Sequence, residues 1–337
     1  MFEENVTRGD RPLPFCYNPK KETKMENQGR IHSFDVLKLL LAFLVVTIHF
    51  PFKTSGDYFI AYGKTAVPIF FVISGYLLYR DDMQEMLPRI YKQTIKILLV
   101  TIISNIIYGA FFYFLEGKYV FRYVYFTHKK IMDFILYNVS PFSEHLWFLG
   151  SMLYALVLII ILAKTNLLKK AMFVAPFLTL AYLLLYWLGP VNPFAYRNAL
   201  LIALPYLMMG MAIRRFETSL MKIKKSVLWL AALTLCITTI VELKTYRRGI
   251  AIPFVSAELL TYVIVLLCLN YKNFGAGTIF EKLGRSCTLF IYIAHIIVAM
   301  ILFEYIPQSS IFVSTLAPVT VYVVTLVLSL WRLLRFF

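Results

Sequence analysis

Long apolar segments recur along the whole chain and are separated by short polar connections. An apolar stretch of about 20 residues has the length of a helix that crosses a bilayer. Residues 65–80 and 198–213 are shorter and contain proline or glycine, so we expect tilted or irregular helices there. The one sizeable connection, 116–144, is aromatic and basic, and we expect a cap or an interfacial helix. The pattern predicts ten membrane helices, at residues 34–52, 65–80, 95–115, 145–163, 171–188, 198–213, 227–243, 252–270, 286–304 and 311–331.

The composition agrees with a membrane protein. Hydrophobic residues make up 60% of the chain and charged residues only 15%, well below the roughly 25% of soluble domains. The net charge of +16 is spread over short connections, so no basic domain that would hold a nucleic acid is present. We therefore predict an all-α, polytopic integral membrane helix bundle with about ten transmembrane helices, whose first partner is the lipid bilayer.

The distribution of basic residues predicts the orientation of the bundle. If both termini are inside, the inner connections carry the larger share of the lysines and arginines. Cytoplasmic connections of membrane proteins show this excess. We therefore expect both termini in the cytoplasm, in agreement with an even number of spans.

The ends of the chain and its cysteines suggest a simple domain organisation. Residues 1–30 are polar and mixed in charge without an apolar core, so they are not a secretory signal. We expect a disordered cytoplasmic arm, with Met25 as an alternative start, followed by one transmembrane domain over residues 31–337. The cysteines show no CxxC pairing, so neither a metal site nor a disulfide framework is expected. They are Cys16, Cys236, Cys268 and Cys287.

The first apolar segment carries titratable residues on one face. Lys38 and His49 are eleven residues apart, about three helical turns, which places them roughly 16 Å apart along one side of a helix. Asp35, three residues before Lys38, joins the same stripe. Titratable side chains inside a membrane helix are costly and usually face the protein interior. The stripe predicts a site that works through the membrane.

Under the predicted orientation, most other titratable groups at membrane depth lie in the outer half. We therefore expect a cavity whose chemistry takes place towards the outer side and which is supplied from inside. The candidate residues of this cavity are Ser74, Glu144, His145, Glu258 and His295.

Five short motifs occur in order along the chain. They are Asp35 and Lys38 followed by His49; Phe70, Phe71, Ser74, Gly75 and Tyr76; His145, Leu146, Trp147 and Phe148; Pro205 to Gly210; and Tyr292 and His295. Together they resemble one family, the integral membrane acyltransferases of the acyltransferase-3 type, which O-acylate bacterial envelope glycans. The resemblance covers about residues 31–335. The family has an arginine where this chain has Lys38, and a lysine offers a point charge in place of a planar fork.

The resemblance implies a reaction and roles for residues of span one. The donor is acyl-CoA as a co-substrate, with acetyl-CoA expected, and no cofactor or metal is permanently bound. The acceptor is a hydroxyl of a cell-envelope glycan or a lipid-linked sugar, at a bacterial cytoplasmic membrane. His49 would be the general base for that hydroxyl, since imidazole titrates near neutral pH. Lys38 would meet the coenzyme phosphates, and Asp35 would orient Lys38.

Each of these residues also has a simpler structural interpretation. His49 would then bond a neighbouring carbonyl at the helix end, and Lys38 would extend to the inner interface or pair with Asp35. Ser74 fits a contact between helices as well as a donor in the cavity, and no nucleophile motif surrounds it. For His295 a structural hydrogen bond and a role in the site remain equal alternatives.

The two carboxylates and the oxyanion donors are left open by the sequence. Glu144 and Glu258 are both candidate partners for a histidine, and His145 lies beside the first of them. Ser74 and His295 are the candidate donors to the oxyanion of a tetrahedral intermediate.

A different function class has a sequence feature in its favour. The membrane half of the membrane-bound serine racemases also resembles this family, and part of its sequence is similar to residues 67–76. The alternative to catalysis is therefore a permease-like membrane protein for a small amino acid such as serine. The other membrane-bound acyltransferase superfamily matches fewer motifs. The sequence leaves the oligomeric state open.

Overall fold

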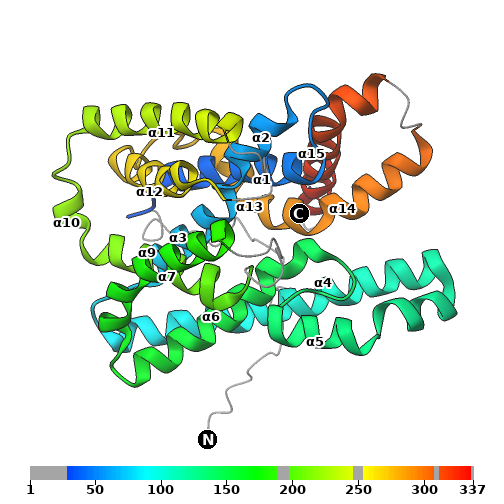
Figure 1. Ribbon diagram of the computed structural model, residues 1–337, viewed down its shortest axis with the longest axis horizontal. Helices are drawn as coiled ribbons and strands as arrows, with labels where there is room; N and C mark the ends of the chain where they lie inside the picture. Colours follow the sequence, from blue (N-terminus) through cyan, green and yellow to red (C-terminus); the bar gives the residue numbers. More distant parts are fainter. Residues whose placement is uncertain (1–28, 189–196, 246–252, 307–310, 335–337) are drawn as a thin grey trace, which may run out of the picture.

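The computed structural model describes residues 29–188, 197–245, 253–306 and 311–334, and within these ranges the regular structure is entirely helical (Figure 1). The N-terminal arm expected at residues 1–30 lies almost wholly outside the described part. The helices are α1 (His32–His49), α2 (Gly56–Gly63), α3 (Ala66–Leu78), α4 (Met83–Tyr125), α5 (His128–Tyr137), α6 (Trp147–Lys164), α7 (Leu168–Leu188), α9 (Leu204–Arg215), α10 (Glu217–Leu220), α11 (Lys225–Thr245), α12 (Val255–Asn270), α13 (Ile279–Ser286), α14 (Thr288–Tyr305) and α15 (Ile311–Leu334).

Eight segments of the described chain are long and apolar enough to cross a membrane, which confirms the predicted polytopic helix bundle. Every predicted helix has a counterpart. The segments predicted at 198–213 and 252–270 correspond to shorter helices, α9 with a preceding π turn (Ala199–Ala203) and α12. Residues 65–80, where a tilted or irregular helix was expected, contain one α-helix, α3, and α2, which lies before them, makes a span of 23 residues together with α3.

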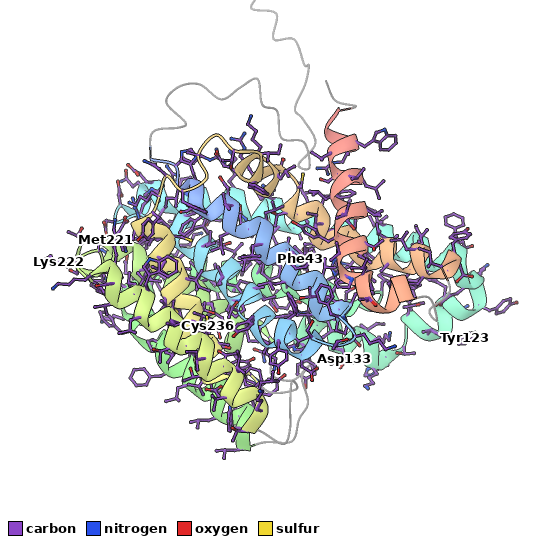
Figure 2. The ribbon with its side chains drawn as sticks, turned by 90° about the horizontal axis from the view of Figure 1, so that it is seen from above. Phe43, Tyr123, Asp133, Met221, Lys222 and Cys236 are labelled. Carbon is purple, nitrogen blue, oxygen red and sulfur yellow. The ribbon has the colours of Figure 1, made fainter. Side chains whose placement is uncertain are left out.

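Connections that were predicted to share the inner side do meet at one end of the molecule. Glu217 of α10 accepts hydrogen bonds from Tyr76 of α3 (2.7 Å) and from Lys272, which follows α12 (2.7 Å). Burial opposes ionisation, but these hydrogen bonds hold the pKa of Glu217 below its usual range, so the carboxylate is charged at neutral pH. Met221 and Lys222 lie at this end, opposite Tyr123 (Figure 2).

Helices α3 and α9 approach closely because each has a glycine at the contact. A Cβ added to Gly75 would lie 2.8 Å from the carbonyl carbon of Leu207 and closer still to its oxygen. A Cβ on Gly210 would meet the backbone of Val72 in the same way. Small residues allow such backbone contact between membrane helices. Two of the motifs identified in the sequence therefore build one helix pair.

Helix α1 is held at its inner end by α13. A Cβ on Gly284 would lie 2.7 Å from the carbonyl carbon of Asp35, so only glycine allows this approach. The outer end of α1 stops at His49, and Phe50 is followed by Pro51. A residue that precedes proline is disfavoured in helical geometry. This stop places His49 on the last turn of α1.

The end of α4 and helix α5 form an arm beyond the other helices, on the right in Figure 1. Gly117 adopts a φ of 81°, which breaks α4 and lets the chain turn back. Aromatic rings hold the arm against the segment that follows it: the ring of Phe121 stacks on that of Phe142, with 5.7 Å between the centroids. Phe142 lies three residues before His145, so the arm packs beside the entry to α6.

Candidate active site

Three histidines from distant parts of the chain converge at the C-terminal end of α1. His49 ends α1, His145 lies in the turn that leads into α6, and His295 lies in the middle of α14. The ring centroids are 6.1 Å apart for His49 and His145, 5.2 Å for His49 and His295, and 5.0 Å for His145 and His295. The sequence predicted His49 and His145 towards the outer side and His295 near the middle of its segment, and the structure brings the three rings together.

Hydrogen bonds fix the ring of His145 on both sides. Its Nδ1 lies 2.7 Å from the Ser143 hydroxyl, and its Nε2 lies 3.4 Å from the hydroxyl of Tyr108. Tyr108 in turn donates to the backbone oxygen of Ile293 at 2.7 Å. The Tyr292 hydroxyl donates to the backbone oxygen of His145. His145 is thus a buried wall of the site that ties α4, α6 and α14 together.

His295 is completely buried, whereas His49 is exposed. The Nδ1 atom of His295 lies 3.0 Å from the backbone oxygen of Ile291 and 2.8 Å from that of Tyr292. Its Nε2 has no hydrogen-bond partner among the described residues. The accessible imidazole of the cluster is therefore that of His49.

His49 opens onto a cavity of about 370 Å³. The cavity is also lined by Lys64, which follows α2, and by Arg197, which precedes the π turn of α9. The same cavity reaches Glu258 of α12, whose carboxylate accepts a hydrogen bond from the Tyr206 hydroxyl. A smaller hollow of about 50 Å³ beside it is lined by His49, His145, Arg197 and Glu144, among others.

The two candidate carboxylates share the cavity region with the histidines but are not bonded to them in the described part of the chain. Glu258 is paired with Tyr206, on the side of α9. Glu144 is exposed at the rim. Ser74 lies elsewhere, because its hydroxyl donates to the backbone oxygen of Phe70 at 2.7 Å, and it does not line the cavity.

Two cations of the cavity escaped the sequence analysis. Lys64 lies within the connection between α2 and α3, and its ammonium stands 4.6 Å from the ring centroid of Phe254. Arg197 lies in a connection whose length gives no hint of its position. Both residues lie at the edges of apolar segments. Charged residues are common at such edges in a membrane protein, so this position alone could not single out Lys64 or Arg197 as part of a site.

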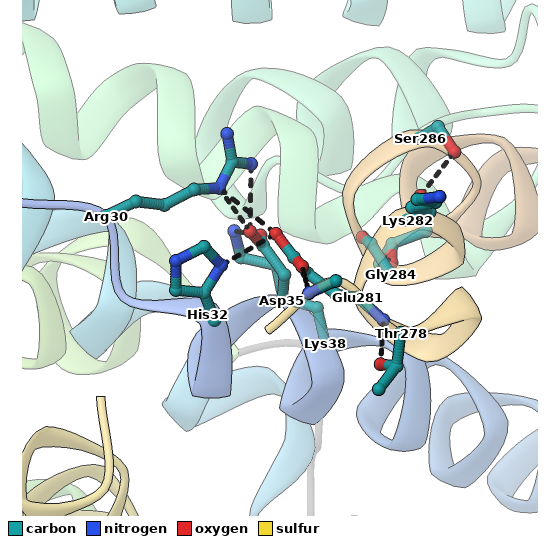
Figure 3. Close-up of polar contacts among 11 residues, drawn as sticks. Arg30, His32, Asp35, Lys38, Thr278, Glu281, Lys282, Gly284 and Ser286 are labelled. Atoms are coloured by element: carbon teal, nitrogen blue, oxygen red, sulfur yellow. Dashed lines mark hydrogen bonds and ion pairs between the residues drawn. The ribbon is translucent and has the colours of Figure 1, made fainter. Parts of the chain in front are cut away.

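At the inner end of α1, Asp35 lies between two cations (Figure 3). The Arg30 guanidinium donates through Nε and Nη2 to Oδ2 of Asp35 at 3.0 and 2.9 Å. Lys38 donates to Oδ1 at 3.1 Å. A guanidinium thus reaches the carboxylate of this motif from outside the helix, although the motif itself carries lysine. The sequence analysis did not single out Arg30.

A second carboxylate completes the inner cluster. Glu281 of α13 lies 2.8 Å from Nδ1 of His32 and accepts a hydrogen bond from the Gly277 amide at 2.7 Å. Burial opposes its ionisation, but these hydrogen bonds lower the pKa of Glu281 below its usual range. The carboxylate therefore stays charged at neutral pH and anchors the N-terminus of α1 to α13.

Further basic residues lie beside Lys38. The ammonium group of Lys96 on α4 is near enough to Lys38 and to Lys92 to be repelled by both of their charges. Arg89, Lys92 and Lys96 line a surface hollow of about 560 Å³ along the inner half of α4. One end of the stripe on α1 thus carries Lys38 within a cluster of cations and carboxylates, and the other end carries the histidine cluster. Among the described residues, no group of three or more His, Cys, Asp or Glu side chains has an arrangement that would hold a metal ion.

Comparison with known families decides between the interpretations of this arrangement. A family model described as an acyltransferase domain matches residues 31–332, nearly the whole chain. The chain belongs to the acyltransferase-3 family. It is an acyltransferase that transfers groups other than aminoacyl groups, and a multi-pass membrane protein. Comparisons with curated proteins and with solved structures gave no match.

Membership gives the polar stripe of α1 a chemical context. Helix α1 lies within the matched residues and carries charged side chains at its N-terminal end and the exposed imidazole of His49 at its C-terminal end. An acyl transfer needs a place for an activated donor and a base for an acceptor. Charged groups lie at one end of α1 and an imidazole that lines a cavity lies at the other.

Proposed function

We propose that this acyltransferase moves an acyl group, with acetyl expected, from cytoplasmic acyl-CoA to a hydroxyl at the outer side of a bacterial cytoplasmic membrane. The acceptor is a cell-envelope glycan or a lipid-linked sugar. One observation carries the proposal: His49 faces a cavity at one end of α1, while Lys38 lies at the other end beside further cations. The two ends are roughly 16 Å apart along the helix, and the extended pantetheine arm of coenzyme A separates its phosphates from its thioester in a similar way.

The donor end of the proposal rests on charge. Phosphates bind to arginine and lysine side chains, arginine as a fork and lysine as a point charge. Lys38 and Arg30 share Asp35, and Lys92 and Lys96 lie close by on α4. This surface supports binding of the coenzyme phosphates. The thioester would then extend along α1 towards His49.

The acceptor end rests on His49. In the proposed step, His49 takes the proton of the acceptor hydroxyl while the oxygen attacks the thioester carbonyl. The C–S bond then breaks, and the coenzyme A thiolate recovers the proton from the imidazolium. The negative charge on the carbonyl oxygen develops within a cavity that holds Lys64 and Arg197, and positive charge in such a site stabilises it. Neither Ser74 nor His295 is assigned as an oxyanion donor.

The test is acyl transfer by the purified protein in liposomes. Acetyl-CoA labelled in the acetyl group is supplied on the side of Lys38, and envelope extract or lipid-linked sugars are supplied on the side of His49. We expect release of free coenzyme A together with label in an alkali-labile ester of the acceptor. Uptake of labelled serine by the same liposomes, without release of coenzyme A under any condition, would contradict the proposal and favour the permease-like function.

Replacing Lys38 tests the donor end. Lys38→Ala is expected to raise the KM for acetyl-CoA about tenfold, because one charge-assisted contact contributes about 1.5 kcal/mol. Asp35 keeps Arg30 as a partner in this variant, so the helix should remain folded. Lys38→Arg restores the family residue and should keep the KM within about threefold of the wild type. The measurement is the rate of coenzyme A release against acetyl-CoA concentration.

A matched control for this experiment is Lys53→Ala. Lys53 is an exposed lysine just beyond the outer end of α1, so its removal should leave the KM for acetyl-CoA unchanged. Equal effects of the two alanine variants would show that the change in KM reflects net charge and not a binding site at Lys38.

A further inference from the structure

The hydrogen bonds of His295 define which of its nitrogens carries a proton. Its Nδ1 lies 3.0 and 2.8 Å from two backbone oxygens, those of Ile291 and Tyr292. Backbone oxygens only accept hydrogen bonds, so Nδ1 must carry the hydrogen. A neutral imidazole has one donor and one acceptor nitrogen. Nε2 of His295 therefore carries a lone pair and can only accept a hydrogen bond.

That lone pair is buried and lacks a partner. His295 is fully inaccessible, and its Nε2 meets no donor among the described residues. A buried acceptor without a hydrogen bond costs about 1–3 kcal/mol. A hydrogen bond from a neighbouring donor would remove this cost. The two nearest imidazoles are those of His49 and His145.

His145 is not that donor, because its own hydrogen bonds use both nitrogens. The single hydroxyl hydrogen of Tyr108 goes to the Ile293 oxygen at 2.7 Å. Tyr108 can therefore only accept from Nε2 of His145, which must carry the hydrogen. Nδ1 of a neutral His145 then accepts from the Ser143 hydroxyl at 2.7 Å. No N–H of His145 remains for His295.

The remaining candidate is His49, and its position suits the role. Its ring centroid lies 5.2 Å from that of His295 with the planes inclined by 45°. Two imidazoles joined by an N–H···N bond of about 2.9 Å have centroids about 5 Å apart. No hydrogen bond joins the rings in the structure, but a turn of the His49 ring would make one. Hydrogen bonds of catalytic groups are often long before substrate binds.

We propose that His295 is a positioning residue for His49. Its Nε2 accepts the N–H of His49, which fixes the tautomer of His49 and directs its other nitrogen, as a lone pair, into the cavity. When His49 takes the proton of the acceptor hydroxyl, the N–H that faces His295 belongs to an imidazolium and the hydrogen bond becomes stronger. No proton passes to His295. This inference rests on the proposed role of His49 as the base.

The first test compares two replacements of His295 in the coenzyme A release assay. His295→Leu removes the lone pair and is expected to lower kcat about 10- to 100-fold, since a base in the wrong tautomer or orientation is ineffective. The KM for acetyl-CoA should stay within about threefold, because the phosphates bind at the other end of α1. His295→Gln offers an N–H donor and an oxygen acceptor, and it should recover at least about tenfold of the loss.

A double variant shows whether His295 acts through His49. If it does, His295→Leu should cost less than about twofold in a His49→Ala background, where no imidazole remains to be positioned. A full loss in that background would overturn the proposal. So would a His295→Leu variant that is folded, with an unchanged thermal midpoint, and keeps the wild-type kcat.

The wild-type protein allows a test that depends neither on folding of a variant nor on the acyl transfer reaction. Nitrogen NMR of protein labelled in histidine reports the tautomer of each ring. We expect His295 to be protonated at Nδ1 and His49 to hold a single tautomer. Averaging of His49 between tautomers, as in free imidazole, would overturn the positioning role. If acyl transfer itself is absent, this measurement still decides whether the two rings are paired.

Discussion

Replacing His49 with glutamine is expected to lower the kcat of acyl transfer by about 10²- to 10⁴-fold, the usual contribution of a positioned general base. Glutamine keeps a polar side chain of similar size but cannot take a proton at neutral pH. The exposed position of His49 on the cavity makes a large effect on folding unexpected. The KM for acetyl-CoA should change by less than about threefold, since the donor phosphates are assigned to the inner end of α1. Coenzyme A release by protein in liposomes, with label traced to the acceptor, measures both constants.

His128→Gln provides a matched control for this variant. His128 is an exposed histidine at the start of α5, on the arm beyond the bundle. Its replacement should leave kcat and KM at wild-type values. A His49→Gln protein of normal abundance that transfers acetyl groups at the wild-type rate would disprove the mechanism. The family assignment would stand, but a different base would then have to be sought in the cavity.

The arrangement of helices was largely predictable from the sequence, and the exceptions have local causes. Helix α1 was expected to run to residue 52 but ends at His49, because Pro51 disfavours helical geometry at Phe50. Helix α2 was missed, since Gly56 and Asp57 at its start and Gly63 at its end interrupt the apolar pattern. This omission concealed the route by which Lys64 reaches the cavity.

The sequence predicted how deep each histidine lies in the membrane, but it did not predict that the three rings meet. The sequence predicts that His49 and His145 lie towards the outer ends of their segments and that His295 lies near the middle of its own. It does not show how far each helix is rotated about its own axis, because rotation is set by packing against neighbours. In this protein Tyr108 joins α4 to both His145 and α14, and that contact between distant segments sets the rotation.

The hydrogen-bond partner of Glu258 is a second case in which the sequence did not show which side chains of different helices meet. The sequence offered a histidine as a partner for this buried carboxylate, and the structure supplies Tyr206 from α9. Tyr206 belongs to the motif that ends in Gly210, so the glycine contact with α3 also determines where its hydroxyl lies. A short motif of mainly apolar residues thus contributes to the site through helix packing as well as through chemistry.

Gly75→Ala is expected to destabilise the bundle by about 1–3 kcal/mol, the usual cost of forcing additional atoms into a packed interior. The new Cβ would lie within 3.0 Å of the backbone of Leu207, and backbone atoms cannot turn aside as a flexible side chain can. Helices α3 and α9 would have to separate. Since α3 carries Val67 and Pro68 and α9 carries Tyr206 to the cavity wall, we also expect acyl transfer to fall. The thermal midpoint in detergent and the abundance in the membrane measure the first effect.

Gly109→Ala distinguishes this clash from a general effect of replacing a membrane glycine. Gly109 also lies inside a helix, α4, but a Cβ there would meet only ring atoms of Phe142, the nearest at 3.2 Å. That ring can shift, and alanine favours a helix over glycine by about 1 kcal/mol. Gly109→Ala should therefore be as stable as the wild type or slightly more so. If Gly75→Ala were equally stable, the close contact of α3 and α9 would not be needed for the fold, and the motif around Ser74 and Gly75 would require a chemical explanation instead.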